Sequence, residues 1–196
     1  VTEQEIGKQL LAETAHYAES SVCRRKTLLH YFGEEYPADN CGNCDNCLNP
    51  KKQVDAKEEL SAILETVAAL KDKFKAEHII DVVSGRETSE VRNYHHEDLD
   101  VFGSLPKADR RRLNTVIRQA IIAGYLDREI ENFGLIKITP KGSAFLKKPD
   151  AFKIVEDNDF NEEEEETPVK SGAACAVDPE LYSILKDLRK KIAKHY

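Results

Sequence analysis

The spacing of hydrophobic positions predicts that the chain is mainly helical. Residues 3–19 and about 21–32 repeat apolar side chains every three or four positions, which is the pattern of amphipathic helices. Ser20 or Ser21 would cap the second helix, and Gly33 follows it where a C-cap is expected. The apolar positions are Ile6, Leu10 and Tyr17 in the first helix and Leu28, Leu29 and Phe32 in the second.

A second periodic region runs from about residue 55 to 148. Asp55 can cap a helix that carries Leu60, Ile63, Leu64, Val67 and Leu70 at helical spacing. A shorter helix in 76–85, one helical turn capped by Thr88 or Ser89 and a long helix in 105–124 follow. The alternating stretch 125–139 predicts a β-hairpin, and Pro140 lies in the first turn of a last helix. Helices followed by a hairpin match the order of a winged helix-turn-helix.

Charged residues are distributed unevenly along the 196-residue chain. The net charge is −7, yet 18 of the 29 Lys and Arg residues lie between 51 and 150. The segment 156–166 is strongly acidic and has little to bury, so we expect residues 150–175 to be a disordered linker. An acidic tail that binds a basic partner is the functional alternative. No apolar run approaches a membrane span, and the start lacks a signal-peptide pattern.

The cysteines carry the clearest chemical signal. Cys23, Cys41, Cys44 and Cys47 have the spacing C-x17-C-x2-C-x2-C, which can supply four thiolates to a tetrahedral zinc ion. Disulfides are disfavoured because the cysteine count of five is odd and nothing indicates secretion. An iron–sulfur cluster is the sharper rival, but the ferredoxin run needs a fourth cysteine at position 51, where this chain has Lys.

Four thiolates would fill every position around zinc and leave none for an activated water, so we expect a structural ion. Its role would be to fix the loop of residues 41–47 to the second helix. Zinc-binding free energy of roughly 10–16 kcal/mol in small modules is enough to fold a segment with so little core. Cys175 stands apart, and we expect it to be a free surface thiol.

Several blocks of this sequence resemble the C-terminal part of RecQ DNA helicases. They are "CRRKTLLHYFGE" at 23–34, "CGNCDNC" at 41–47, "SGRETSEVRNY" at 84–94, "VIRQAIIAGYL" at 116–126 and "ITPKG" at 138–142. The resemblance covers about residues 1–148, and the stretch from about 176 resembles the start of a helicase-and-RNase-D C-terminal (HRDC) domain.

The resemblance implies an organisation in four parts. Residues 1–54 would form a helical zinc-binding module and 55–149 a winged-helix (RQC) DNA-binding domain. Residues 150–175 would be the linker, and 176–196 the first helix of a truncated HRDC-like domain. The fold class expected is therefore mainly α with a small β-hairpin.

The resemblance also implies a function for a larger parent protein. That parent would be an ATP-dependent 3′–5′ DNA helicase of recombination and repair, cytoplasmic and associated with the bacterial nucleoid. This chain has no G-x-x-x-x-G-K-[ST] phosphate loop, so ATP and Mg²⁺ would bind only in motor domains upstream. The chain itself, which begins at Val and has no Met, would be a non-catalytic piece and a monomer.

Duplex or forked DNA is the expected partner. Arg86, Ser89 and Arg92 surround one helix start, which favours phosphate, and the matching segment of the family contacts the duplex backbone. The alternative is that these are solvated polar residues, since Glu87 and Glu90 weaken the local field.

Other candidate DNA contacts lie farther along the chain. Arg110, Arg111 and Arg112 begin the longest helix of the domain, where a solvated face is an equal alternative. Phe133 at the wing tip could stack on a terminal base pair as a separating wedge, although this hairpin is short. Lys137, on the second strand of the hairpin, completes the candidate set. His95 and His96 are expected to form a surface turn and not a second metal site.

A protein-docking role is the second functional hypothesis. Winged helices often bind proteins, and the resembling bacterial domain receives the acidic tail of single-stranded DNA-binding protein on a basic pocket. Competition between duplex DNA and an acidic peptide separates the two hypotheses.

Overall fold

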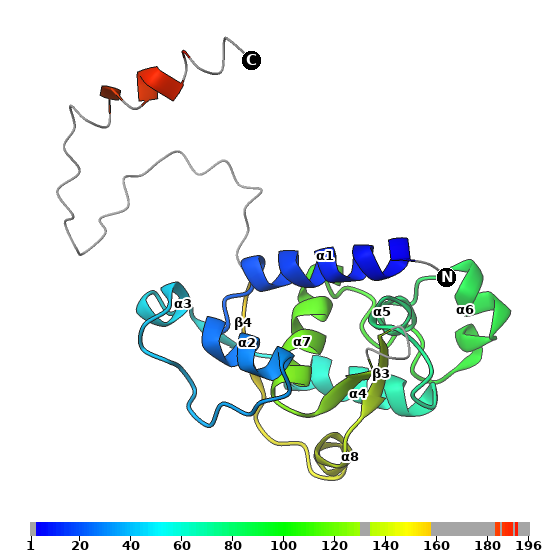
Figure 1. Cartoon of the computed structure of the whole chain (residues 1–196). Helices are drawn as coiled ribbons and strands as arrows, with labels where there is room; N and C mark the ends of the chain where they lie inside the picture. Colours follow the sequence, from blue (N-terminus) through cyan, green and yellow to red (C-terminus); the bar gives the residue numbers. More distant parts are fainter. Residues whose placement is uncertain (1–2, 130–133, 158–182, 185, 190, 192–196) are drawn as a thin grey trace. The chain divides into compact units, whose positions relative to one another are not determined.

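The computed structural model describes residues 3–129, 134–157, 183–184, 186–189 and 191. The chain divides into a unit of residues 1–159 and a second unit of residues 160–196. The first unit contains both the cysteine cluster and the predicted winged helix (Figure 1). In the second unit the described residues are helical, and Ile184 and Leu188 are exposed. The acidic stretch from residue 158 onward and Cys175 lie outside the described residues, and the HRDC-like assignment stays a prediction.

Residues 1–54, the predicted zinc-binding segment, contain one long helix, one helix of eight residues and one short turn of helix. They are α1 (Glu3–Glu19), α2 (Arg24–Tyr31) and α3 (Asp45–Leu48). Both predicted helices are present, but α2 begins at Arg24 because Cys23 occupies the N-cap position. The expected cap at Ser20 or Ser21 was wrong: the Ser20 Oγ accepts a hydrogen bond from the Val22 N–H, one turn too early to cap the helix.

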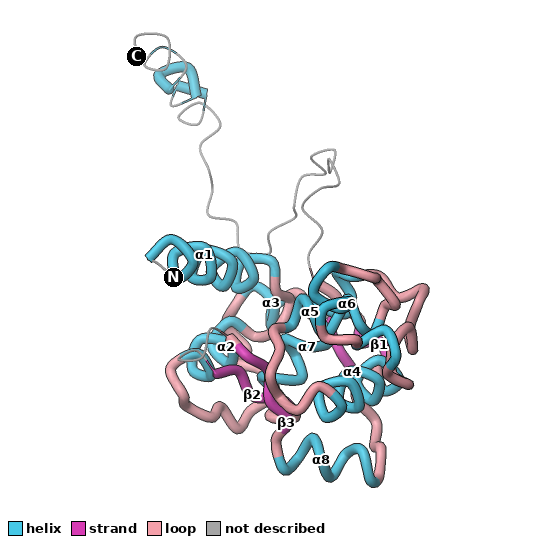
Figure 2. Tube along the Cα trace, turned by 90° about the vertical axis from the view of Figure 1, so that its right-hand side faces the viewer, coloured by secondary structure: helices cyan, strands magenta, loops and turns pink. Residues whose placement is uncertain are grey.

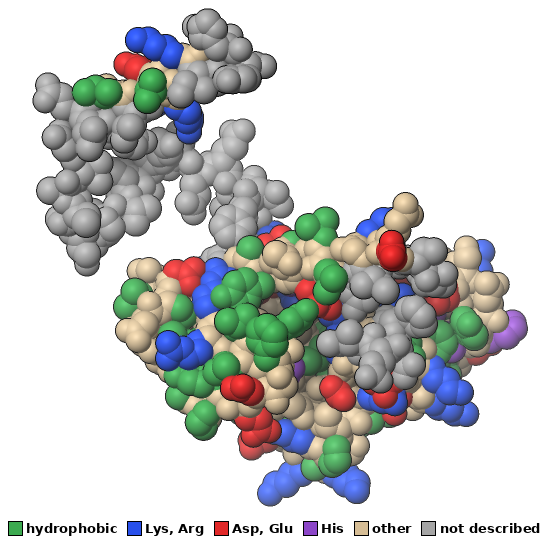
Figure 3. Space-filling view, viewed as in Figure 1, with side chains coloured by type: hydrophobic (Ala, Val, Ile, Leu, Met, Phe, Trp, Pro, Cys, Tyr) green, Lys and Arg blue, Asp and Glu red, His purple; other side chains and the backbone are tan. Residues whose placement is uncertain are grey.

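The apolar positions predicted for these two helices are exposed or half-buried wherever their side chains are described, and the side chain of Ile6 lies outside that part. Leu10 and Leu28 are about half exposed, at 48% and 47%, and so is Tyr31, at 49%, which was not among the predicted positions. They line a groove of about 590 Å³ between α1, α2 and the later helix α7. Figure 3 shows green apolar side chains gathered over the α1–α2 face. The amphipathic pattern therefore marks an open groove and not a closed core.

The winged-helix segment carries the hydrophobic core. Its elements are α4 (Lys57–Ala69), α5 (Ala76–Val83), α6 (Ser89–Asn93), the 3-10 helix η1 (His96–Asp98), α7 (Arg110–Ile122), β2 (Leu126–Glu129), β3 (Leu135–Ile138) and α8 (Pro140–Lys147). The predicted stripes of α4, α5 and α7 meet in this core, where Ile63, Ile79 and Leu113 are fully buried. Figure 2 shows α8 at the end of the unit, below α4. The predicted fold class is confirmed.

The hairpin is held to the helices on both sides. β2 and β3 pair antiparallel, with Leu126 opposite Ile138, and the Ile136 N–H donates to the Phe74 carbonyl before α5 at 3.0 Å. On the other side α8 packs closely, and only glycine fits at position 142 because an added Cβ would lie 2.3 Å from the Tyr125 carbonyl oxygen. This packing fixes where the wing leaves the domain.

A second strand pair was not predicted. β1 (Gln53–Asp55) pairs antiparallel with β4 (Lys153–Val155), and Phe152 and Ile154 are buried in the core. The linker was expected to begin at residue 150, but residues 151–157 belong to the folded unit. The reason is local: "AFKIV" supplies two buried apolar side chains that the acidic stretch after it lacks.

Candidate metal centre and nucleic-acid interface

Four cysteine thiols gather at one point of the zinc-binding segment. The sulfur atoms of Cys23, Cys41, Cys44 and Cys47 all lie within 4.8 Å of one another, and Cys41 and Cys47 are 3.9 Å apart. Tetrahedral zinc with bonds of about 2.3 Å separates its sulfur ligands by about 3.8 Å. Cys23 is buried at the start of α2, whereas the other three lie half-buried on the loop and α3. The predicted spacing thus brings its members together.

The conformation of the cysteine loop brings its thiols together and changes their pKa values. Gly42 has φ +68°, a left-handed conformation that lets the chain turn back between Cys41 and Cys44. Hydrogen bonds from the backbone N–H groups of Asn43 and Cys44 lower the pKa of the Cys41 thiol to about 6. Desolvation by burial raises the pKa of the Cys47 thiol to about 11. Metal binding to these thiols would release the protons that they still carry.

The geometry favours a single metal ion over the alternatives. All four described cysteines are free thiols, so none is committed to a disulfide. A cluster of several iron atoms would hold four thiolates farther apart than one ion does. Sulfur separations near those of tetrahedral zinc fit a closed structural site, and no fifth ligand joins the group among the residues that the structure describes.

Two polar side chains hold the cysteine loop against the helices. The sequence analysis did not identify either of them. Asn46 donates from Nδ2 to the carbonyl oxygens of Ser20, at 2.8 Å, and Val22, at 2.7 Å. Arg24 forms a two-pronged ion pair with Asp45, with distances of 3.1 Å from Nε to Oδ1 and 2.9 Å from Nη2 to Oδ2. These partners are more than twenty residues apart, so no local pattern could have paired them.

The first group of DNA candidates surrounds the start of α6. Thr88 caps this helix by accepting a hydrogen bond from the Val91 N–H at 3.3 Å. Arg86 and Ser89 are exposed, and within the described residues the Arg86 side chain forms no ion pair. Arg92 is exposed as well but pairs with Glu87, with Nη2 and Oε2 2.7 Å apart.

The arginines at the start of α7 are bound into the fold. Arg110 pairs with Asp81 of α5 at 2.5 Å. Arg112 donates to Glu59 of α4 at 2.8 Å and to the Asp55 carbonyl at 2.9 Å. Arg111 is half-buried, and its N–H donates to the Asp109 side chain that caps α7. Arg110 and Arg112 thus have partners within the fold, and a DNA contact by the three arginines stays a prediction.

Two candidate DNA contacts, Phe133 and Lys137, lie on the wing, and the structure describes only Lys137. Lys137 on β3 forms an ion pair with Glu129 on β2, and hydrogen bonding to that carboxylate raises the pKa of Lys137. Phe133 lies outside the described residues, so its wedge role stays a prediction.

Comparison with known protein families matches both parts of the chain. The RecQ zinc-binding family matches residues 1–48, and the RQC domain family matches residues 50–163. The chain therefore belongs to the RQC domain family and corresponds to a C-terminal region of a RecQ-type protein.

Individual relatives agree with this assignment. The chain is 28% identical to the ATP-dependent DNA helicase RecQ of Pasteurella multocida and 28% identical to that of Haemophilus influenzae, each over 97% of this chain. It is 24% identical to the ATP-dependent DNA helicase RecQ of Bacillus subtilis over 93% of this chain. The matches cover only 30%, 31% and 29% of these relatives, so the chain spans about a third of their length.

In the part of the chain that the structure describes, no helix combines the length and the apolar content needed to cross a bilayer.

Proposed function

We propose that this chain is the zinc-stabilised, DNA-binding accessory region of an ATP-dependent 3′–5′ DNA helicase that acts in recombination and repair. The observation that carries the proposal is the gathering of four thiols within 4.8 Å beside a domain of the RQC family. Catalysis would belong to motor domains outside this sequence, where ATP and Mg²⁺ would bind. The whole protein would act in the cytoplasm, at the nucleoid.

Zinc held by Cys23, Cys41, Cys44 and Cys47 would have a structural role. The zinc-binding segment buries few apolar side chains, and α2 has no buried residue among those described. Its order therefore depends on the metal, on the Asn46 hydrogen bonds and on Arg24. We assign the segment 1–54 to this module and 55–157 to the winged helix, which has its own core.

The surface at Arg86, Ser89 and Arg92 is the DNA contact that we propose. Arg86 is exposed without an ion pair in the described residues, and Ser89 can donate to a phosphate oxygen. Arg92 would leave its ion pair with Glu87 and bind a phosphate group in its place. Contacts to the backbone alone carry no base information, so the preference among sequences should be slight.

A titration of a forked duplex by fluorescence anisotropy at several salt concentrations tests this surface. Replacing Arg86 and Arg92 together by Ala should weaken binding and lower the salt slope by about two units if each meets one phosphate. Arg25→Ala is the matched control, because Arg25 is an exposed arginine on the zinc-module helix α2. Binding and slope equal to those of the unchanged protein would exclude residues 86–92 as the DNA site.

Docking of an acidic partner tail, such as that of single-stranded DNA-binding protein, is the second function implied by the resemblance. Adding an acidic peptide during the same titration tests it. Displacement of the duplex by the peptide would favour a shared docking surface, whereas no competition would favour the DNA role.

A further inference from the structure

His78 is a buried histidine that lies between two other titratable side chains. It belongs to α5, and its side chain is 2% exposed. Its Nε2 lies 2.7 Å from Nδ1 of His96 in η1, and its Nδ1 lies 3.3 Å from Oε2 of Glu90 in α6. One buried ring therefore contacts both α6, which carries the proposed DNA contact, and the 3-10 helix that follows it.

Neighbouring aromatic rings fix the orientation of His78. Phe74 stacks on His78, with ring centroids 4.3 Å apart. Tyr94, the residue that ends α6, stacks on His96 with centroids 5.5 Å apart and meets Phe74 edge-on. Because these four rings pack on one another, the two nitrogens of His78 stay directed at Glu90 and His96.

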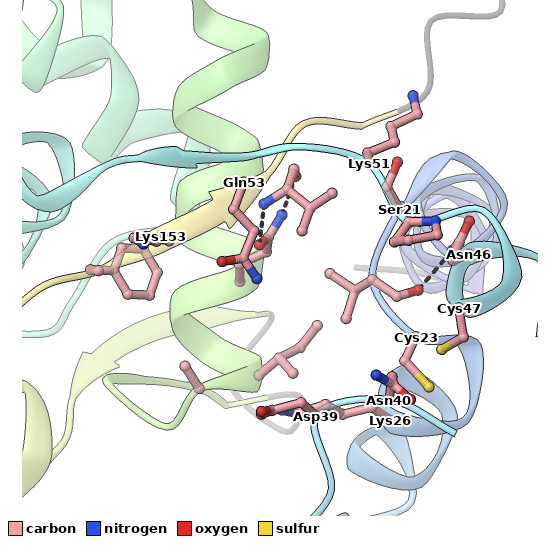
Figure 4. A pocket seen from close by; sticks show the side chains of 17 residues that line it. Ser21, Cys23, Lys26, Asp39, Asn40, Asn46, Cys47, Lys51, Gln53 and Lys153 are labelled. Carbon is pink, nitrogen blue, oxygen red and sulfur yellow. Dashed lines mark hydrogen bonds between the residues drawn. The ribbon is translucent and has the colours of Figure 1, made fainter. Parts of the chain in front are cut away.

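The Nδ1 atom of His78 has no hydrogen bond. Within the described residues it is one of four buried side-chain atoms without such a partner, and the others are Ser21 Oγ, Glu97 Oε2 and Arg128 Nε. Ser21 lines a cavity of about 420 Å³, which has room for water (Figure 4). The Nδ1 atom of His78 instead faces a carboxylate that is near enough for an ion pair, although the two atoms form no hydrogen bond.

The short contact between the two histidines limits where protons can lie. A neutral imidazole has one N–H, and only one proton fits between Nε2 of His78 and Nδ1 of His96. A proton added to the pair is held best by His78, because that ring then donates to His96 from Nε2 and to Glu90 from Nδ1. A buried charge needs an opposite charge and hydrogen bonds, and a protonated His78 would have both.

The other nearby charges favour the same position for the proton. His96 resists protonation, because burial and then the charge of His78 lower the pKa of His96. Glu97 in η1 acts in the opposite direction on His96 but does not cancel the shift. On α5 itself, Asp81 lies one turn beyond His78 and is already paired with Arg110. The carboxylate left to pair with His78 is therefore that of Glu90.

Glu90 connects this proton to the DNA contact. It lies in the first turn of α6, next to Ser89, and its side chain is 60% exposed. As a free carboxylate it repels the phosphate groups that Arg86 and Arg92 would bind. As the partner of a protonated His78 it would be neutralised, and that repulsion would be removed.

We propose that His78 is a positioning residue for the DNA contact, which on protonation pairs with Glu90 and removes one negative charge from the surface of residues 86–92. This surface then binds phosphate more tightly in mildly acidic solution than at neutral pH, the range in which histidines change charge. The inference rests on the proposed DNA contact, but the proton on His78 can be tested without DNA.

Long-range ¹H–¹⁵N NMR of the histidine rings in the zinc-loaded full chain tests the proton directly. At about pH 5.5 His78 should carry protons on both nitrogens, whereas His96 should stay neutral with Nδ1 as the acceptor. Glu90→Gln should reduce the protonated fraction of His78 at the same pH, since an amide cannot form the ion pair. A neutral His78 beside a protonated His96, or an unchanged fraction in Glu90→Gln, would overturn the proposal.

Fluorescence anisotropy with a forked duplex at low salt tests the consequence for binding. The unchanged protein should bind about two- to fivefold more tightly at about pH 5.5 than at about pH 7.5, as expected for one partly exposed charge. Glu90→Gln should already bind tightly at the higher pH and gain nothing on acidification, and His78→Gln should lose the gain. His95→Gln, at a histidine that is 79% exposed, is the matched control and should keep it.

The outcomes separate this proposal from the DNA contact on which it rests. If the variant with Arg86→Ala and Arg92→Ala binds like the unchanged protein, the DNA contact itself fails. If that variant binds weakly but Glu90→Gln keeps the full gain on acidification, only the proposal for His78 fails. Should His78→Gln lose its fold by circular dichroism, the exposed Glu90→Gln decides the question.

Discussion

Arg92 and Glu87 form an ion pair across the start of α6, with Nη2 and Oε2 2.7 Å apart and both side chains more than half exposed. Such an exposed pair contributes little to stability, about 0–1 kcal/mol. Its consequence for binding is larger, because Glu87 both occupies Arg92 and repels phosphate.

Replacing Glu87 by Gln should therefore tighten the binding of forked duplex several-fold at low salt. Releasing Arg92 to one phosphate should also steepen the salt slope by about one unit. Anisotropy titration at several salt concentrations measures both effects. Glu58→Gln, the same charge change at an exposed position on α4, should have the smaller effect. Equal effects of the two substitutions would mean that only net charge matters and that α6 does not meet DNA.

Asn46→Ala should weaken zinc binding. Its Nδ2 group holds the carbonyls of Ser20 and Val22, and loss of partners that orient a metal site costs about 10–100-fold in affinity. Competition with a chromophoric zinc chelator measures the change. Asn43→Ala is the matched control, since Asn43 is exposed in the same loop. If both variants retain the affinity of the unchanged protein, Asn46 does not position the ligands.

Ile154→Ala should destabilise the winged helix by about 2–5 kcal/mol, because the side chain is 1% exposed and its removal leaves a cavity. Urea unfolding followed by circular dichroism measures the loss. Ile184→Ala, at a position that is 61% exposed, is the control and should be nearly neutral. A neutral result for Ile154 would mean that the folded unit ends before β4, as the sequence analysis expected.

His96 should make the fold sensitive to acid. Its Nδ1 lies 2.7 Å from Nε2 of the buried His78, and partial burial, followed by the charge of His78, lowers the pKa of His96. Glu97 and Glu90 oppose this shift but do not cancel it. The unfolded chain therefore takes up the proton more readily than the folded chain, so stability falls as pH drops through the ordinary histidine value of about 6.5.

Melting temperatures at about pH 7.5 and about pH 5.5 test this sign. His96→Gln should reduce the loss of stability on acidification, whereas the exposed His95→Gln should leave it unchanged. An identical loss in His96→Gln would show that this histidine does not contribute.

The order of the helices and the hairpin could be predicted because each element has a signal in its own stretch of sequence. Leu60, Ile63 and Val67 repeat at helical spacing, and Gly33 and Gly124 follow helices where caps are expected. The cysteine spacing likewise identified four thiols that the fold brings within 4.8 Å.

What could not be predicted depends on residues that are distant in the chain. β1 and β4 are three residues each and lie about a hundred positions apart, so neither carries a periodic signal. The pairing of Arg112 with Glu59 and of Arg110 with Asp81 also required the fold. Charge alone left DNA contact and a solvated helix face as equal alternatives for these arginines, and it did not indicate their partners within the fold.

The metal content of the purified chain tests the central claim most directly. Elemental analysis should find about one zinc per chain in a colourless protein, because four thiolates fill a closed tetrahedral site. Cys44→Ser should lose that zinc and make residues 1–50 sensitive to protease, while α4 to α8 stay folded on their own core. Stoichiometric iron with the visible absorbance of an iron–sulfur cluster, or zinc retained in full by Cys44→Ser, would contradict the account.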